Sequence, residues 1–299
     1  MTIVPIILLL LISFEGIFII TYIKDYILYK KTPESSTEEL AGAPIVFVIS
    51  SAVINFFDTL GLGSFAIATI FFRHFKLVTD KKLPGTLNTA FTLPIMMQAL
   101  LFIIEVKVDI LTLVLMIASA TLGATIGAGI VAKLDENKVR LYMSLALTLV
   151  IILILCKQLN ILPKGGDQLG LTGFNLVIGV FGNFVLGVLM TIGVGLYAPC
   201  LALVYSLGMN PLVAFPIMMG SCAFLMIPAS IRFIKAGAYN RKATLWSALG
   251  GVIGVYIAVS FVKSLSLYIL TWGIVIILGY TAISMFIASQ KSHKQIIIK

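Results

Sequence analysis

The chain has 299 residues, of which 60% are hydrophobic and only 11% are charged. A soluble domain carries roughly a quarter charged residues, so this composition excludes a protein with water as its main solvent and indicates one embedded in a lipid bilayer. The apolar runs are long and continuous, which predicts helices rather than the short alternating strands of a membrane barrel. The net charge of +9 arises in short loops rather than on one basic face, so no nucleic-acid partner is expected.

The first predicted element is a transmembrane helix over residues 3–23, which forms a unit with a cytoplasmic loop up to residue 42. Its apolar run is too long for the h-region of a secretory signal, and neither a basic n-region nor a small-residue cleavage site accompanies it. The helix is therefore expected to remain in the mature protein. Glu15 lies within it, and an ionisable group inside a membrane helix is a functional candidate.

The rest of the chain contains two kinds of apolar segment. Residues 64–76 and 196–208 would each cover roughly 20 Å as a helix, which is less than the roughly 30 Å of the hydrocarbon core. We therefore expect two half-helices, each packed in a hairpin with the span before it. The other segments are long enough to cross the bilayer, and they lie near residues 43–60, 83–104, 110–132, 140–157, 172–191, 211–234, 243–262 and 266–288.

A glycine motif precedes each predicted half-helix. The sequence Thr-Leu-Gly-Leu-Gly at residues 59–63 stands 132 residues before Thr-Ile-Gly-Val-Gly at residues 191–195. A second match pairs residues 122–127 with residues 249–254, each holding two Leu/Ile-Gly pairs at the same spacing. The order of the matches predicts an internal duplication, with repeat 1 over residues 43–157, repeat 2 over residues 172–288 and a cytoplasmic tail over residues 289–299.

The distribution of Lys and Arg predicts the orientation. If each hairpin enters and leaves on the same side, seventeen basic residues fall on one face, and the other holds only Lys107, Lys157, Lys164 and Lys263. The positive-inside rule makes the first face cytoplasmic, with the N-terminus outside and the C-terminus inside a bacterial-type plasma membrane. Each half then has one hairpin and three crossings, so the halves are inverted relative to each other. The predicted fold class is an all-α, multi-pass protein with two inverted-topology repeats, an architecture typical of transporters.

The two glycine motifs are the predicted substrate site, through Gly61, Gly63, Gly193 and Gly195. Glycine permits the backbone geometry that breaks a helix, and non-helical backbone at membrane depth survives only where it is buried in protein or lines a cavity. The new helices, which begin at about Ser64 and residue 196, present unpaired amides and a positive dipole end. Two such ends would bind a small anionic substrate near the midplane. The alternative is that these glycines only allow close helix packing.

Four polar side chains lie near these breaks. Asn88, Thr89 and Ser221, early in the spans that follow the hairpins, could hydrogen-bond the same substrate or bond back to their own helices. Asp58 stands three residues before Gly61 inside an apolar run. It could carry a coupling proton or cation, or it could contact the exposed amides at the break in a structural role.

An enzyme is not expected, and no catalytic residue, metal site or cofactor is predicted. Ser64 follows two glycines, but the only histidines are His74 on the same short segment and His293 in the tail, so a serine nucleophile has no base from another segment. A passive anion channel and a non-transporting membrane sensor are the alternatives to a transporter. The glycine-rich stretches 121–129 and 250–254 could pack within one subunit or between the subunits of a homo-oligomer.

Over residues 43–288 the chain resembles the sulfite exporter TauE/SafE family of membrane permeases. The resemblance rests on Asp-Thr-Leu-Gly-Leu-Gly-Ser-Phe at residues 58–65, on Leu-Pro-Gly-Thr-Leu-Asn-Thr at residues 83–89, and on the second glycine turn with Pro199. It implies a duplicated helical fold in the plasma membrane and transport of small sulfur-containing anions such as sulfite or sulfonates. Family members often carry three nearly contiguous glycines and then a proline. In this chain Ser64 and Phe65 follow the first turn, and Leu196 and Tyr197 follow the second, so bulkier residues would line the site.

Overall fold

The computed structural model describes residues 3–32, 43–59, 63–105, 107–159, 161, 166–193, 195–261, 283 and 286. Within this part of the chain the regular elements are helices, apart from one isolated bridge between Gln168 and Met209. An all-α fold is therefore confirmed. In chain order the elements are α1 (Ile3–Lys30), α2 (Pro44–Thr59), α3 (Ser64–His74), α4 (Leu83–Glu105), α5 (Ile110–Val131), α6 (Glu136–Gln158), α7 (Gly173–Met190), α8 (Tyr197–Ser206), the 3-10 turn η2 (Pro211–Val213), α9 (Ala214–Lys235) and α10 (Arg241–Phe261).

The helix boundaries follow the predicted segments closely. The two short segments form the short helices α3 and α8, of 11 and 10 residues. α1 continues seven residues beyond its predicted end, to Lys30, and α6 begins four residues earlier than predicted, at Glu136. The last predicted span, over residues 266–288, lies outside the described residues except for residues 283 and 286.

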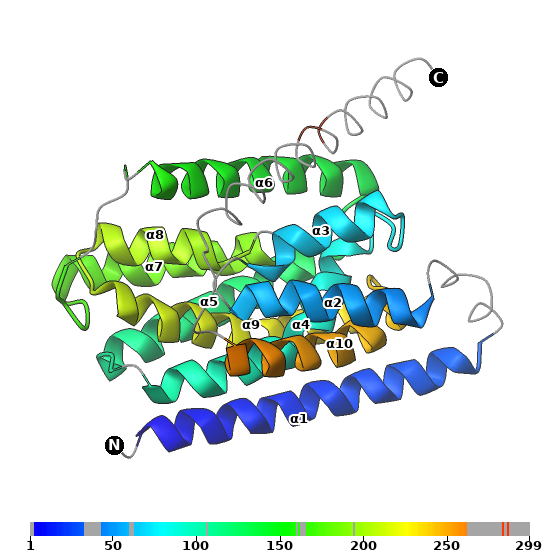
Figure 1. Ribbon diagram of the computed structural model, residues 1–299, viewed down its shortest axis with the longest axis horizontal. Helices are drawn as coiled ribbons and strands as arrows, with labels where there is room; N and C mark the ends of the chain where they lie inside the picture. Colours follow the sequence, from blue (N-terminus) through cyan, green and yellow to red (C-terminus); the bar gives the residue numbers. More distant parts are fainter. Residues whose placement is uncertain are drawn as a thin grey trace.

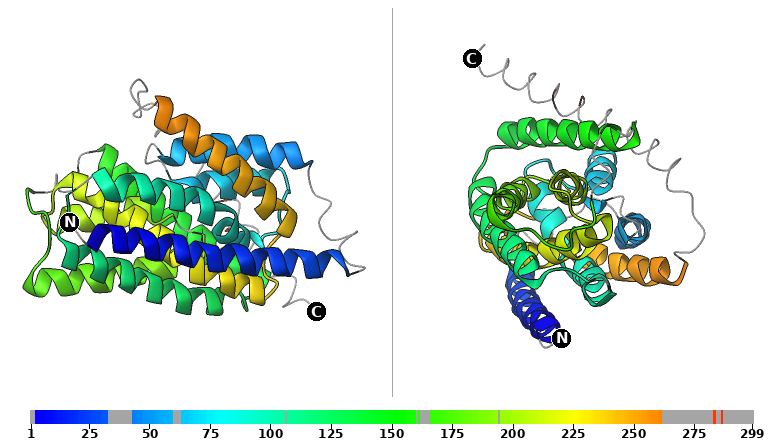
Figure 2. Two further views of the ribbon diagram at one scale, coloured as in Figure 1. Left: turned by 90° about the horizontal axis from the view of Figure 1, so that it is seen from below. Right: turned by 90° about the vertical axis from the view of Figure 1, so that its left-hand side faces the viewer.

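The described helices have the dimensions of a membrane protein. Five of them, α1, α5, α7, α9 and α10, are long and apolar enough to cross a bilayer. α9 is mostly enclosed by its neighbours, whereas α1 exposes large apolar side chains such as Leu9 and Leu28 along its length. So much exposed apolar surface is unfavourable in water and favourable in lipid. Figures 1 and 2 show α1 and α6 on opposite sides of the bundle.

Helices α2, α4 and α10 run in the same direction. Gly250 and Gly254 of α10 lie against Val48 and Ala52 of α2, so the two helices advance together. Along α4, the Thr86 hydroxyl accepts a hydrogen bond from the Asn240 amide over 2.9 Å, and one turn later Thr89 shares a 2.7 Å hydrogen bond with Thr244 of α10. At Gly250 and Gly254 the backbones of α10 and α2 lie so close that no Cβ fits between them.

Helices α5, α7 and α9 form a second group with a common direction. Gly123 and Gly127 of α5 lie against Phe184 and Val188 of α7. The same helix α5 meets α9 at Ile117 with Gly220 and, further on, at Gly129 with Arg232. The glycine-rich stretches 121–129 and 250–254 therefore make their close packing inside the chain.

The two groups meet at α4 and α9, which run in opposite directions. Thr92 of α4 shares a 3.0 Å hydrogen bond with Ser230 of α9. Before Thr92 along α4, Gly85 lies against Phe233, and after it Ile103 lies against Gly220. Because the partners on α9 fall in number as those on α4 rise, the helices are antiparallel, and the groups cross the bundle in opposite senses.

The loops gather at two ends of the bundle. At one end, the amide of Asp109 donates to the carbonyl of Leu169, and the amide of Asn210 donates to that of Gln168, each over 2.8 Å. At the opposite end lie the loops that contain Asp80 and residues 236–240, together with the start of α6. The loops near Asp109, Gln168 and Asn210, which the Lys and Arg distribution places outside, lie together at one end of the bundle. The loops near Asp80 and Asn240, which it places in the cytoplasm, lie together at the other end.

This grouping makes a topology prediction. A cysteine that replaces Gln168 should react with a membrane-impermeant maleimide added to intact cells, and a cysteine that replaces Lys81 should react only after permeabilisation. The positive-inside rule places Lys81 in the cytoplasm. The background is a protein with Cys156, Cys200 and Cys222 replaced by alanine. Labelling of both positions from the same side would contradict the inverted arrangement.

Candidate functional site

The start of α3 is capped by a carboxylate from the preceding helix. Asp58, the penultimate residue of α2, is 1% exposed, and its Oδ1 accepts a hydrogen bond from the backbone amide of Ser64. Gly63 has φ of 83°, in the left-handed region that glycine adopts without strain. Gly61 lies outside the described residues. The Asp58 side chain therefore takes the place at this helix end that an anion was predicted to occupy.

A chain of hydrogen bonds continues from Asp58 to the start of α8. Asp58 Oδ2 accepts a 2.9 Å hydrogen bond from Nε2 of Gln98, in the second half of α4. Gln98 Oε1 accepts a 2.7 Å hydrogen bond from the hydroxyl of Tyr197, the first residue of α8. Gln98 and Tyr197 are both buried. One buried polar chain thus connects the starts of the two short helices, which are 133 residues apart in sequence.

The second glycine turn lies beside the first short helix. A Cβ on Gly195 would be 3.9 Å from the Cβ of Phe65, the second residue of α3, so the two breaks adjoin. Gly193 has φ of 104°, and a Cβ there would come within 2.7 Å of Met143 Cε in α6. The backbone conformation of Gly193 therefore requires glycine, and a Cβ there would also displace the end of the Met143 side chain.

Two groups at the breaks are left for a ligand. The residue before α8, Leu196, offers no side-chain acceptor to the first amides of the helix. The Ser64 hydroxyl is buried and has no hydrogen-bond partner among the described residues. A buried hydroxyl without a partner costs about 1–3 kcal/mol, and a bound ligand that accepts from it would remove this cost.

The three predicted side-chain ligands hydrogen-bond elsewhere. Asn88 donates to the carbonyl of Pro84 over 2.9 Å, and its Oδ1 is buried without a partner among the described residues. Thr89 connects α4 to α10, as described above. Ser221 of α9 accepts a 2.9 Å hydrogen bond from Asn183 of α7. Their direct role in substrate binding stays a prediction.

Gln98 and Tyr197 were absent from the predicted site. Gln98 is the only glutamine in the predicted span 83–104, and an amide in an apolar helix needs a partner, which was a usable signal. Tyr197 occupies the position that Phe65 holds in the first repeat, so the hydroxyl is the difference between the two breaks. Neither signal identifies Asp58 as the acceptor of the Gln98 amide, or Gln98 as the acceptor of the Tyr197 hydroxyl.

Two clusters of charged residues lie at the end of the bundle opposite Asp109. Asp80 binds Arg73 of α3 at 3.1 Å and Arg140 of α6 at 2.7 Å, and Arg140 also pairs with Glu136. These residues line a cavity of about 400 Å³. They connect the first hairpin to α6.

The second cluster joins α1 to the start of α10. Asp25 binds Arg241 at 2.7 Å and accepts a hydrogen bond from the Tyr239 hydroxyl. Burial raises the pKa of Tyr239, and the Asp25 carboxylate raises it further, so Tyr239 stays a neutral donor at physiological pH.

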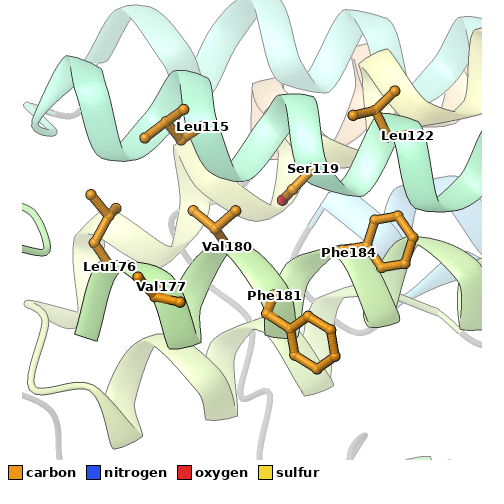
Figure 3. A pocket seen from close by; sticks show the side chains of 8 residues that line it. All are labelled: Leu115, Ser119, Leu122, Leu176, Val177, Val180, Phe181 and Phe184. Atoms are coloured by element: carbon orange, nitrogen blue, oxygen red, sulfur yellow. The ribbon is translucent and has the colours of Figure 1, made fainter. Parts of the chain in front are cut away.

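A larger cavity has the wrong chemistry for an anion. Figure 3 shows an apolar groove of about 510 Å³ between α5 and α7, with one polar side chain, Ser119, in its lining. Val177 and Phe181 on its edge are 61% and 67% exposed, as expected for side chains that face lipid. Among the described residues there is also no group of three or more His, Cys, Asp or Glu side chains that could hold a metal ion.

No family model, curated protein or solved structure matches the chain. The resemblance to the TauE/SafE family therefore stays a prediction. Function has to be inferred from the chain's own residues, of which the buried connection Asp58–Gln98–Tyr197 is the most unusual feature.

Proposed function

We propose that the chain is a secondary transporter of a small anion, which binds between the two helix breaks and crosses by alternating access. The observation that carries the proposal is the chain of hydrogen bonds from Ser64 through Asp58 and Gln98 to Tyr197. Buried polar groups inside a membrane bundle are costly unless they bind or move something polar. This chain lies where two short helices begin, the usual place of a transporter site.

The packing of the helices supports two inverted repeats. In repeat 1 the glycine pair of α5 packs on α7 of repeat 2, and in repeat 2 the matching pair of α10 packs on α2 of repeat 1. Each repeat thus gives its glycine helix to the other repeat's hairpin. The two resulting groups run in opposite directions, which is the relation that inverted repeats require.

The chemistry of the breaks favours an anion. The first turn of α8 and the Ser64 hydroxyl offer donors without a cation nearby, because the charged side chains described above lie at the end of the bundle. An ionised Asp58 would repel an anion at this place, so loading requires that Asp58 be neutralised, which supports proton coupling. The resemblance of residues 58–65 and 83–89 to sulfite exporters adds the substrate class, a sulfite or sulfonate, and a cell membrane as the location.

Uptake into liposomes tests the proposal. Purified protein should move one of sulfite, thiosulfate, sulfoacetate, taurine, sulfate or chloride, saturably and with counterflow, and faster with an inward proton gradient. Gly193→Leu should reduce uptake to background because leucine is strained at a φ of 104° and its side chain must also displace Met143. Gly16→Leu is the matched control, since no atom lies within 4 Å of a Cβ there.

Three outcomes would contradict the proposal. Conductance without saturation would indicate a channel, and binding without movement would indicate a sensor. If none of the anions binds or moves, the site is not an anion site. A milder variant, Ser64→Ala, guards against a folding defect in Gly193→Leu and should raise the KM several-fold while the protein remains folded.

A further inference from the structure

We propose that Gln98 is a positioning residue that couples a proton on Asp58 to anion binding at Tyr197. When Asp58 takes up a proton, the Gln98 amide turns over, and the Tyr197 hydroxyl is released to donate to the anion. The inference rests on the proposed transport function and assigns its coupling mechanism to three residues.

The hydrogen bonds of this chain have one polarity. The Ser64 amide can only donate, so Asp58 Oδ1 must accept. Asp58 Oδ2 accepts from the Gln98 amino group, which leaves the Gln98 carbonyl oxygen for the single donor of Tyr197. The Ser64 and Tyr197 hydroxyls also interact with the Asp58 carboxylate. The carboxylate thus receives donors and gives none, which is the pattern of an ionised group.

Protonation of Asp58 is incompatible with this arrangement. A proton on Oδ2 would point at the amino group of Gln98, and two donors would face each other at the 2.9 Å separation of Oδ2 and Nε2. Rotation of the Gln98 amide by half a turn removes the conflict because the two ends of an amide have nearly the same size. Asp58 then donates to Gln98 Oε1, and Gln98 Nε2 donates to the Tyr197 oxygen.

The consequence falls on Tyr197. Its oxygen now accepts from Gln98, and the Asp58 carboxyl, with which the Tyr197 hydroxyl also interacts, is neutral and a weaker acceptor. The single proton of Tyr197 is therefore available to another acceptor. Tyr197 is the first residue of α8 and lies two residues after Gly195. An anion bound at this helix end is the acceptor of matching chemistry. One proton is bound by Asp58 for each anion, and no bond is formed or broken other than hydrogen bonds and the O–H of the carboxyl group.

The coupling of Asp58 to Tyr197 through Gln98, called the relay below, is specific because the three side chains are buried. Asp58, Gln98 and Tyr197 are 1%, 0% and 5% exposed, so water does not replace the lost partners. The other titratable groups that interact with Asp58 in the described structure are Tyr197 and the Cys222 thiol of α9. On α10 the charged residues Arg241 and Lys242 lie at its first turn, and on α3 Arg73 and His74 lie at its last turn. Among the residues that the structure describes, no charged side chain interacts with the Asp58 carboxyl.

The relay is tested first without any substrate, by infrared difference spectra of the protein between acid and alkaline pH. Titration of the Asp58 carboxyl, identified by its loss in Asp58→Asn, should shift the ring mode of one tyrosine, identified by its loss in Tyr197→Phe. In Gln98→Leu the carboxyl should still titrate, and the tyrosine mode should shift much less than in the unsubstituted protein, because only the direct interaction of Tyr197 with Asp58 remains. Gln168→Leu, at an exposed loop position, is the control and should behave as the unsubstituted protein.

Two results would overturn the relay. The first is a tyrosine shift in Gln98→Leu as large as in the unsubstituted protein, which would mean that Tyr197 responds to the charge of Asp58 directly. The second is the absence of any tyrosine shift, or of an Asp58 titration, in the unsubstituted protein. If Gln98→Leu does not fold, Tyr197→Phe and Asp58→Asn still decide whether the two groups respond together.

Binding of the transported anion gives the second readout. The affinity should rise about tenfold for each pH unit below neutrality until Asp58 is protonated, because one proton accompanies each anion. In Asp58→Asn the affinity should be independent of pH, and in Tyr197→Phe it should be lower at acid pH only. An unsubstituted protein that binds no anion would reject the proposed function, and the infrared result would still judge the relay.

Discussion

Gly254→Leu is expected to separate α2 from α10 and to be among the most destabilising single changes in the chain. A Cβ at this position would lie 2.0 Å from the carbonyl oxygen of Ala52. Because the obstacle is backbone, neither side chain can rotate away, and the helices must move apart. Overpacking of a core typically costs about 1–3 kcal/mol, and the backbone collision places this substitution at or above the upper value. The measurement is the thermal unfolding midpoint of the detergent-solubilised protein.

The internal repeat provides a second copy of the same experiment. Gly123→Leu in α5 would place a Cβ 2.1 Å from the carbonyl oxygen of Phe184 in α7 and should lower the unfolding midpoint by a similar amount. Gly16→Leu adds the same side chain to open space on α1 and should leave the midpoint unchanged within error. Equal stability of Gly254→Leu and Gly16→Leu would contradict the close packing of α2 on α10.

The helices could be predicted from the sequence because a membrane helix needs only one local property, about 20 apolar residues in a row. Among the described helices, five are long and apolar enough to cross a bilayer, and those at the predicted spans 43–60, 83–104 and 140–157 are not among them. The ends were harder to predict where local signals compete. The charges of residues 24–30 resemble a loop, but Asp25 binds Arg241 and Tyr22 stacks on Tyr26, so α1 continues to Lys30. The partner of Asp25 is 216 residues away in the sequence and leaves no local pattern there.

The early start of α6 had a usable local signal. Asp135 accepts a hydrogen bond from the amide of Lys138, the arrangement of a helix cap, and this amide holds the pKa of Asp135 below its usual value. An aspartate followed by helix-forming residues is the sequence pattern of such a cap. The prediction began the span at Arg140 because it followed hydropathy alone.

The site was predicted in part. The glycine breaks and Asp58 were identified because glycine and a lone carboxylate are conspicuous in an apolar run. The contact of Asp58 with the Ser64 amide spans six residues, and it was one of the two roles considered for Asp58. The hydrogen bond from Gln98 to Asp58 joins residues 40 positions apart, and the hydrogen bond from Tyr197 to Gln98 joins residues 99 positions apart. Such pairings depend on how α4 packs between the two hairpins, which no single segment encodes.

Asp80→Ala is expected to release α6 from the first hairpin. Asp80 is the common partner of Arg73 and Arg140, whose side chains are 17% and 24% exposed. Without it, two partly enclosed guanidinium groups lose the acceptor that they share and repel each other, although Arg140 keeps its pair with Glu136. Removal of one partner of a buried pair costs about 3–5 kcal/mol, and partial exposure reduces this to about 1–3 kcal/mol. Lys138→Ala is the matched control and should have little effect, because it breaks an ion pair with Asp135 whose side chains are 60% and 55% exposed and leaves the Asp135 cap in place.

The release of α6 should also reach the proposed transport site, because Met143 of α6 packs against Gly193 at the second break. We therefore expect Asp80→Ala to lower the affinity for the transported anion as well as the unfolding midpoint. High salt should weaken the unsubstituted protein toward the variant, since it screens partly exposed ion pairs. Uptake assays and unfolding at two salt concentrations measure both effects. A variant that loses stability but keeps its affinity would show that α6 is held to the hairpin without shaping the site.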